Sequence, residues 1–172
     1  ASYDYLLPAA ATLDPGWVRK MVSECGDASG GIQVPIRVLE DARAVLHHAR
    51  ASVVASGTAT VEAALIGNPF IAVYRLSAFN YAVASHLVQL PHVAMANLIA
   101  GRRVVPELIQ NDFTPENVVS ALQPLLQDSN ARTKMIADLA EVRDALHFHG
   151  NDSCTRVDET AIDRVADWVM RF

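Results

Sequence analysis

VVASGTATVEAALIGNPFIAVYR, from Val53 to Arg75, combines an uncharged run, a turn of small residues, a helical pattern and a second uncharged run. The two runs, Ala51 to Ala55 and Phe70 to Tyr74, lack alternating polarity, which is typical of strands that are buried on both faces. Between them, Thr58 to Ile66 reads as a helix that Gly67 ends. Buried strands joined through a helix predict a parallel sheet of the α/β class.

The composition is that of a globular domain, with 172 residues of which 51% are hydrophobic and 19% charged. The formal net charge is −5, which argues against a surface that neutralises nucleic acid, so no nucleic-acid partner is expected. The two cysteines have no CxxC spacing, and a reducing cytosol is therefore expected. Leu76 to Gly101 carries no charge, but a proline and several polar residues interrupt it, so a buried helix and strand fit better than a membrane span. The chain opens directly on a predicted strand, which indicates a piece of a larger protein.

The remaining segments extend the same alternation of strands and helices. Further strands are expected at 3–10, 32–38 and 92–96, and further helices at 14–25, 39–49, 78–90, from 115 onward, 130–148 and 157–172. The sequence therefore predicts one Rossmann-like domain over residues 1–172. Its parallel sheet is expected to have helices on both faces and to be closed by the C-terminal helices.

The small-residue turn lies where ligands of open α/β sheets bind, at the carboxyl end of a strand. Ser56 and Thr58 offer hydroxyls, Gly57 lets the backbone come close, and the first N–H groups of the helix suit a diphosphate. Glu62 lies one turn further along, where its carboxylate can accept hydrogen bonds from a vicinal diol such as that of ribose. Spacing alone favours a simpler alternative, a well-capped helix with an exposed glutamate.

A second polar tract, MANLIAGRRVVPELIQ from Met95 to Gln110, is expected at the same edge of the sheet. Asn97 can donate and accept hydrogen bonds, which suits a uracil edge or a sugar hydroxyl. Arg102 or Arg103 can meet a phosphate group with a forked geometry. The alternative, which composition alone favours, is an asparagine that satisfies loop backbone beside two solvated arginines.

Three tracts in register resemble the C-terminal half of the lipid-A-disaccharide synthase family, namely LLPAAATLD, ASGTATVEAALIGNPFIAVYR and NLIAGRRVVPELIQ. The resemblance implies a GT-B fold, with two Rossmann-like halves around a cleft, in which this chain is the donor-nucleotide half. The implied reaction transfers 2,3-diacylglucosamine with inversion from UDP to 2,3-diacylglucosamine 1-phosphate (lipid X), in lipid A biosynthesis. The donor substrate is a UDP-sugar, and no metal or other cofactor is expected.

The resemblance also implies roles for single residues. The diphosphate would lie against the turn at Ser56 and the ribose against Glu62, and Asn97 would support catalysis. The implied nucleotide-binding residues are Ser56, Gly57, Thr58, Glu62, Asn97, Leu98, Ala100 and Gly101, with Arg75, Arg102 and Arg103 as further candidates. The general base would belong to the missing N-terminal half, so the isolated chain is expected to bind UDP weakly and to be inactive.

Partners and alternatives follow from the same comparison. The implied partners are the N-terminal half of the same protein, a second copy through the C-terminal helices, and the inner face of the bacterial inner membrane, on the cytoplasmic side. Residues 157–172 carry an apolar stripe at helical spacing. The alternative to contact with a second copy is that this stripe packs within the domain. Two other functions stay open: half of another UDP-sugar GT-B enzyme, such as an epimerase or a peptidoglycan glycosyltransferase, and a nucleotide-binding module without catalysis. His147 and His149 do not share a helix face, so no metal site is expected there.

Overall fold

The computed structural model describes residues 3–10, 12–28, 35–75 and 92–146, and within them strands alternate with helices. The strands are β1 (Tyr5–Pro8), β2 (Ile36–Leu39), β3 (Ser52–Ala55), β4 (Phe70–Tyr74) and β5 (Glu107–Ile109). The helices are α1 (Pro15–Ala28), α2 (Ala42–His48), α3 (Thr58–Ile66), α5 (Met95–Ala100), the 3₁₀ turn η1 (Gln110–Asp112), α6 (Pro115–Leu126) and α7 (Asn130–Leu146). The predicted α/β class is confirmed.

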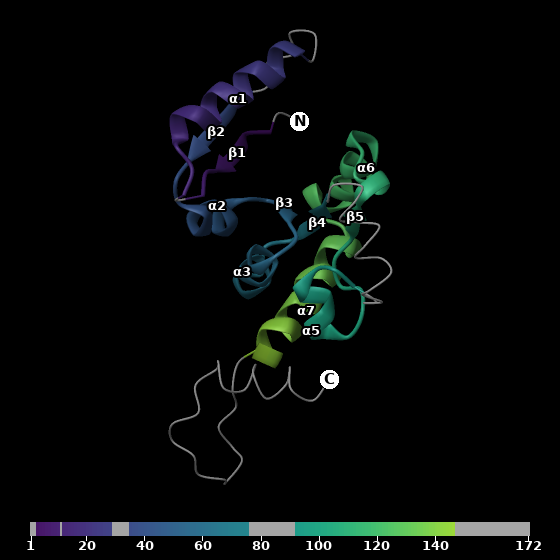
Figure 1. Cartoon of the computed structure of the whole chain (residues 1–172). Coiled ribbons are helices and arrows are strands. Elements are labelled where there is room, and N and C mark those ends of the chain that lie inside the picture. The colour runs from purple at the N-terminus through teal and green to yellow at the C-terminus, as the bar shows by residue number, and fades with distance from the viewer. Residues whose placement is uncertain (1–2, 11, 29–34, 76–91, 147–172) are drawn as a thin grey trace, which may run out of the picture.

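Strand pairing in the described chain is parallel throughout. β1 pairs with β2, and β4 pairs with β3 on one side and β5 on the other. These pairs form two sheets, with strand orders β1-β2 and β3-β4-β5, which Figure 1 shows one above the other. The predicted parallel sheet is thus confirmed in its pairing, but the described residues divide it in two.

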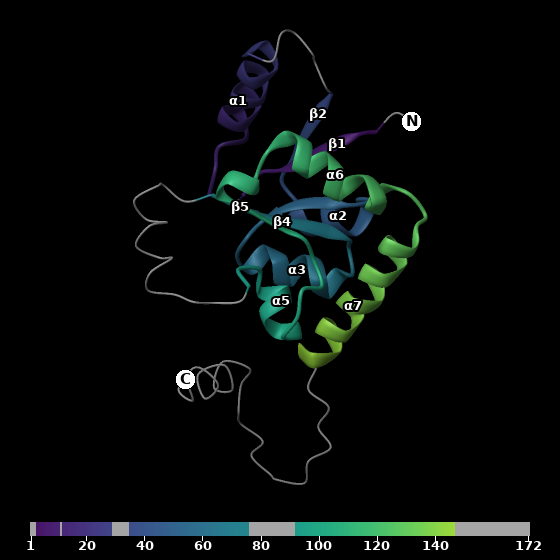
Figure 2. The same cartoon turned by 90° about the vertical axis from the view of Figure 1, so that its right-hand side faces the viewer.

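The core lies around β4, the central strand of the three-stranded sheet. Phe70 and Ile71 are fully buried, and helix α7 contributes Leu139 to the same cluster. Burying each of these side chains stabilises the fold by about 1.5–3 kcal/mol. Figure 2 shows α6 on one side of this sheet and α3 and α5 on the other, with α7 packed against α3 and α5. The prediction of helices on both faces is confirmed for this sheet.

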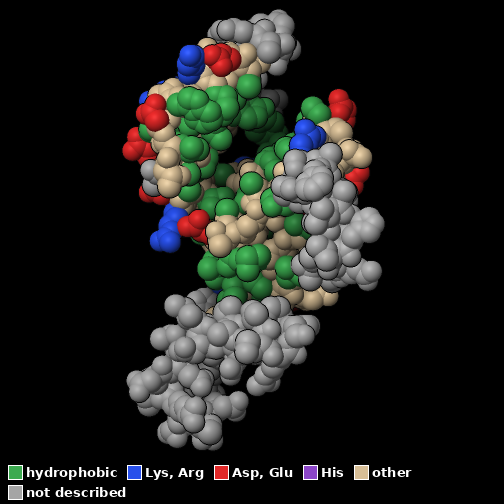
Figure 3. All heavy atoms as spheres, viewed as in Figure 1, with side chains coloured by type: hydrophobic (Ala, Val, Ile, Leu, Met, Phe, Trp, Pro, Cys, Tyr) green, Lys and Arg blue, Asp and Glu red, His purple; other side chains and the backbone are tan. Residues whose placement is uncertain are grey.

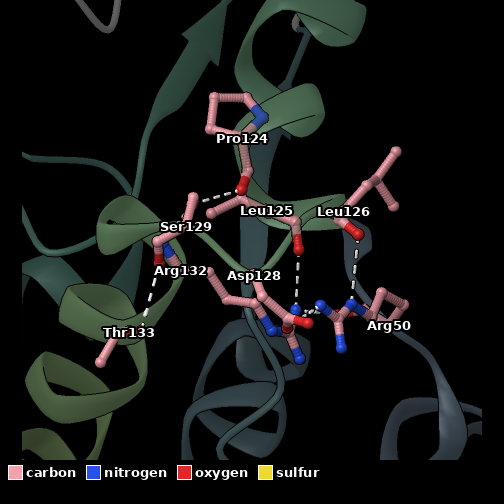
Figure 4. A network of polar contacts seen from close by, with 8 residues as sticks. All are labelled: Arg50, Pro124, Leu125, Leu126, Asp128, Ser129, Arg132 and Thr133. Atoms are coloured by element: carbon pink, nitrogen blue, oxygen red, sulfur yellow. Dashed lines mark hydrogen bonds and ion pairs between the residues drawn. The ribbon is translucent and has the colours of Figure 1, made fainter.

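A polar network fastens the corner between α6 and α7 to the start of β3 (Figure 4). Arg50, just before β3, donates from Nε to the carbonyl oxygen of Leu126 at 3.2 Å and forms an ion pair with Asp128. Arg132 of α7 donates from Nη1 to the carbonyl oxygens of Arg50, at 2.5 Å, and Leu125, at 2.8 Å. This network lies at the amino end of β3, opposite the end of that strand where α3 begins.

The predicted strand at 92–96 is wrong, because the chain enters helix α5 at Met95 and the fifth strand is β5. The carboxylate of Glu107, not a neighbouring strand, accepts hydrogen bonds from the backbone N–H groups of Val93 and Ala94, at 3.1 and 2.8 Å. Gly101 ends the helix with a left-handed φ of 63°. A glycine in this conformation commonly ends a helix. Because residues 76–101 are uncharged, sequence analysis did not recognise the helix that Gly101 ends.

Several sequence predictions fall on residues that the structure does not describe. These are the helices at 78–90 and 157–172 with the apolar stripe of the latter, and the pair His147 and His149. Within the described ranges, no helix is both long and apolar enough to cross a bilayer.

Candidate functional site

The turn between β3 and α3 forms the centre of the candidate site. The backbone N–H of Ser56 donates to the carbonyl oxygen of Val73 at 2.8 Å, which is the last rung between β3 and β4. The chain then turns at Gly57 and starts α3 at Thr58. The amino end of α3 therefore opens at the carboxyl edge of the sheet, where parallel α/β sheets bind ligands.

The backbone conformation of this turn requires a glycine at the position of Gly57. Its φ of 148° lies in a region that residues with a side chain rarely adopt, while a Cβ atom placed there would meet nothing within 4 Å. Its carbonyl oxygen accepts hydrogen bonds from the N–H, at 3.1 Å, and the hydroxyl, at 2.7 Å, of Thr60. These two bonds fix the first turn of α3.

The first amides of α3 are available to an anion. Thr58 and Ala59 are exposed, no side chain among the described residues caps the helix, and its first turn holds no acidic residue. An uncapped helix start presents unpaired N–H groups together with the positive end of the helix dipole. This geometry suits a phosphate or diphosphate.

The Ser56 side chain is hydrogen-bonded to another part of the protein. Its Oγ is partly buried and donates to the carbonyl oxygen of Val93 at 3.0 Å. While that bond holds, the Ser56 hydroxyl cannot donate to a diphosphate as well. Ser56 thus joins the end of β3 to the segment that precedes α5, and α3 packs against α5, so the two predicted polar tracts do lie side by side.

Glu62 lies one turn beyond Thr58 on α3, as the sequence predicts. Its Oε1 accepts a hydrogen bond from Arg43 Nε at 2.6 Å, and its side chain is 34% exposed. This hydrogen bond, with the attraction of the charge on Glu62, raises the pKa of Arg43. Arg43 comes from α2, which sequence spacing could not bring to Glu62. The carboxylate is accessible and held in place, as a diol acceptor needs to be.

Asn97 is the hub of a buried network. Its side chain is fully buried, and its Oδ1 accepts hydrogen bonds from the backbone N–H groups of Val104, at 2.7 Å, and Val105, at 2.9 Å. Its Nδ2 donates to the carbonyl oxygen of Val105 at 3.0 Å and to Glu107 Oε1 at 2.8 Å. An asparagine side chain has two N–H donors and an oxygen that can accept two hydrogen bonds, and these four bonds use all of them. In this structure Asn97 therefore satisfies loop backbone, the alternative that composition favoured.

Glu107 is the residue that sequence analysis missed as part of the site. Its Oε1 accepts hydrogen bonds from Asn97 and from the N–H groups of Val93 and Ala94, which hold the segment that Ser56 contacts. The only sequence signal was an acidic residue at the start of an otherwise apolar strand. Between Ser56 and Glu107 there is no space that admits a water molecule.

The rest of the second tract surrounds this network. Leu98 and Ala100 of α5 are partly buried, and Gly101 is exposed at the end of the helix. Arg103 donates from Nη2 to the carbonyl oxygen of Glu107 at 3.4 Å.

Arg102 is directed to α7 and away from the turn at Ser56. Its Nη2 donates to Asp138 Oδ1 at 3.0 Å and to Glu141 Oε2 at 2.6 Å. Burial raises the pKa of Asp138, but hydrogen bonds from Arg102 and Lys134 outweigh burial and bring that pKa below its ordinary value. Arg102 thus stabilises the packing of α7 in this structure.

Arg75 follows β4 and contacts the turn after β5. Its Nη2 donates to the carbonyl oxygen of Phe113 at 2.8 Å, and its guanidinium lies 5.3 Å from the centre of the Phe113 ring. Gln110, in the same turn, has a left-handed φ of 53°. Arg75 therefore supports this turn at the carboxyl edge of the sheet.

In the part of the chain that the structure describes, no three His, Cys, Asp or Glu side chains are grouped so that they could hold a metal ion. Among the described residues at this edge, backbone amides and the Thr58 hydroxyl can meet negative charge, while Arg75 and Arg103 already contact protein groups.

Comparison with known proteins gives one consistent result. A family model described as lipid-A-disaccharide synthetase matches residues 27–161. A protein of Acidobacterium capsulatum named lipid-A-disaccharide synthase is 54% identical over 166 residues, which cover 92% of this chain and 42% of that protein. Proteins of the same name from Koribacter versatilis and Syntrophus aciditrophicus are 42% and 35% identical, over 97% and 85% of this chain and 41% and 37% of theirs. The chain spans about two fifths of the length of these curated relatives.

Proposed function

The chain belongs to the lipid-A-disaccharide synthase family, and from that premise we propose that it forms the donor-nucleotide half of such an enzyme. The complete protein would transfer 2,3-diacylglucosamine from UDP to lipid X with inversion. The residues of this chain would bind the UDP part of the donor. The activity of the complete enzyme would need the part of the protein that this chain does not span.

One observation carries the proposal, the exposed and uncapped start of α3 behind Gly57. When the sugar leaves UDP, negative charge develops on the diphosphate. Preorganised N–H donors and a helix dipole stabilise such charge without needing a metal ion. The N–H groups of Thr58 and Ala59 and the hydroxyl of Thr58 would meet the diphosphate.

The neighbouring residues would orient the nucleotide. Glu62, held by Arg43, would accept hydrogen bonds from the 2′ and 3′ hydroxyls of the ribose. Ser56, Asn97 and Glu107 would act as positioning residues, because their hydrogen bonds hold the segment before α5 against the turn. Residues 98–101, at the end of α5, would lie beside the donor substrate.

The remaining partners belong to the same proposal. The general base would come from the N-terminal half, and no metal or other cofactor would take part. The enzyme would work at the cytoplasmic face of the bacterial inner membrane, in peripheral contact with it, and a second copy would associate through the C-terminal helices. These statements rest on family membership.

A charge-reversal pair tests the nucleotide site in the full-length protein. Thr58→Glu places a carboxylate at the first position of α3, where acidic residues favour helices, so the fold should persist while diphosphate is repelled. Asn130→Glu makes a matched change at the first position of α7, another exposed helix start. Titration calorimetry with UDP should show binding at least about 10-fold weaker for Thr58→Glu, or about 1.4 kcal/mol, and unchanged for Asn130→Glu. Equal affinities in the two variants would refute the site.

The choice among enzyme reactions needs a separate assay. Full-length protein supplied with UDP-2,3-diacylglucosamine and lipid X should release UDP and form the disaccharide. UDP binding without any disaccharide would favour the alternatives, another UDP-sugar enzyme or a module without catalysis.

A further inference from the structure

Gln110 has a backbone conformation that a residue with its side chain disfavours. Among the residues that the structure describes, it is the one residue other than glycine with a positive φ, at 53°. Glycine adopts this conformation without cost, and asparagine and aspartate adopt it more readily than glutamine does. The shape of the turn alone therefore does not call for a glutamine. Backbone strain of this kind is concentrated at functional sites.

The surroundings of Gln110 hold this strained turn in place. The carbonyl oxygen of Gln110 accepts hydrogen bonds from the N–H of Phe113, at 3.3 Å, and from Arg75 Nη2, at 3.5 Å. Arg75 also donates to the carbonyl oxygen of Phe113 and lies over its ring, and Phe113 packs against the core. A strained conformation persists only where several such contacts determine it together. They fix the point from which the Gln110 side chain leaves the backbone.

The register of the sheet places Gln110 level with the turn that starts α3. Ser56 and Tyr74 are the next residues after a paired position of β3 and β4, and Tyr74 pairs with Ile109 of β5. Gly57 and Gln110 thus each lie one residue beyond the same level, at the carboxyl edge. Neighbouring strands are about 4.8 Å apart, so β5 is about 10 Å from β3. A sugar joined to a diphosphate at the start of α3 can span this separation.

Glu62 indicates the direction in which that sugar would lie. Helix α3 packs against both α2 and α5, and Figure 1 shows it between them. Glu62 is on the side of α2, because Arg43 of α2 donates a hydrogen bond to it. With the ribose at Glu62 and the diphosphate at the start of α3, the opposite direction, toward α5 and β5, is left for the sugar.

The surface in that direction suits an uncharged group. Helix α5 carries no charged residue, and Leu65 of α3 and Met95 of α5 are both 40% exposed. Figure 3 shows mainly uncharged side chains over α3 and α5. A glutamine amide offers hydrogen-bond donors and an acceptor without repelling the diphosphate. The hydroxyl and acylamino groups of a sugar can bind to both.

We propose that Gln110 is a specificity-determining residue, whose side-chain amide contacts the transferred sugar of the donor. This inference rests on the proposed function, because it takes the diphosphate to lie at the start of α3. The amide donates to and accepts from the polar groups of the sugar. UDP lacks the sugar, so the binding of UDP itself does not depend on Gln110.

A glycine variant in the full-length protein tests this contact. Gln110→Gly removes the amide and the backbone strain together, and Asn111→Gly is the matched control, because Asn111 is exposed in the same turn and has no positive φ. Titrations with UDP-2,3-diacylglucosamine and with UDP, without lipid X, give the ratio of the two affinities. Gln110→Gly should lower the affinity for the donor relative to UDP about 10-fold, as expected for one or two lost hydrogen bonds. Asn111→Gly should leave the ratio unchanged, and equal ratios in the two variants would overturn the proposal.

Thermal unfolding of the same variants separates a ligand contact from a structural role. If the Gln110 side chain serves the ligand, Gln110→Gly relieves strain, and it should melt at no lower temperature than Asn111→Gly, which has no such strain to relieve. A lower melting temperature for Gln110→Gly would overturn the proposal, because the side chain would then stabilise the turn.

Failure of this inference differs from failure of the proposed function. Equal UDP affinities in Thr58→Glu and Asn130→Glu would refute the nucleotide site, and the role of Gln110 with it. UDP binding that depends on Thr58, together with an unchanged ratio in Gln110→Gly, would refute the role of Gln110 alone.

Discussion

Replacing Asn97 by alanine should destabilise the protein more than removal of an exposed asparagine. The change leaves Val104, Val105 and Glu107 without four hydrogen bonds, all made to a fully buried side chain. At about 1 kcal/mol for each bond, the loss is about 4 kcal/mol. That is a large part of the 5–15 kcal/mol, roughly, that stabilises a typical domain. Urea titration of the full-length protein measures the change in the free energy of unfolding.

The control is Asn117→Ala on α6, because the exposed Asn117 side chain makes one hydrogen bond, to the carbonyl oxygen of Asp112 at 2.9 Å. Its loss should be about 0.5–1 kcal/mol. Asn97→Asp extends the test, since it sets an oxygen in place of the amide nitrogen that lies 2.8 Å from Glu107 Oε1. That variant should be less stable at pH 7 than at pH 4. If Asn97→Ala costs no more than the control yet weakens UDP binding, Asn97 contacts the ligand and the positioning role is refuted.

Three further predictions concern the ion pairs of Asp138, the hydrogen bonds of Arg132 and the ribose contact of Glu62. Because the pKa of Asp138 is lowered in the folded protein, its stabilisation is complete above about pH 4 and is lost as the pH falls further. Urea titrations from pH 5 to pH 2, roughly, should show a steeper loss for the unaltered protein than for Asp138→Asn, and parallel curves would contradict this. Arg132→Ala removes two hydrogen bonds that the side chain donates to backbone carbonyl oxygens and should cost about 1–3 kcal/mol, against less than about 0.5 kcal/mol for Arg143→Ala on the same helix; equal losses would contradict it. Glu62→Gln should weaken UDP binding about 10-fold but leave the affinity for 2′,3′-dideoxy-UDP unchanged; equal losses for both nucleotides would exclude a ribose contact.

Local signals in the sequence predicted the elements whose ends are fixed by their own residues. Helix α3 and strand β4 were predicted with their observed bounds, because Gly57 and Gly67 provide the two ends of the helix. The helices predicted at 14–25 and from 115 onward are also found, and their caps are local: the side chains of Asp14 and Thr114 each accept a backbone hydrogen bond, at 2.9 and 3.2 Å. Signals of this kind depend on neighbours within four residues.

Contacts between distant residues could not be predicted in this way. Glu62 and Arg43 lie 19 residues apart, and Glu107 reaches back 14 residues to Val93. Sequence analysis could not show that this carboxylate holds the segment before α5. It therefore predicted a strand at 92–96. The division of the sheet was not predicted either, since uncharged strands say nothing about which neighbour each one pairs with.

The central claim is that the start of α3 holds the diphosphate of the donor, and a crystal structure of the full-length protein with UDP bound tests it most directly. The account predicts phosphate oxygens at about 3 Å from the backbone nitrogens of Thr58 and Ala59. A diphosphate bound elsewhere, with both amides open to solvent, would contradict it.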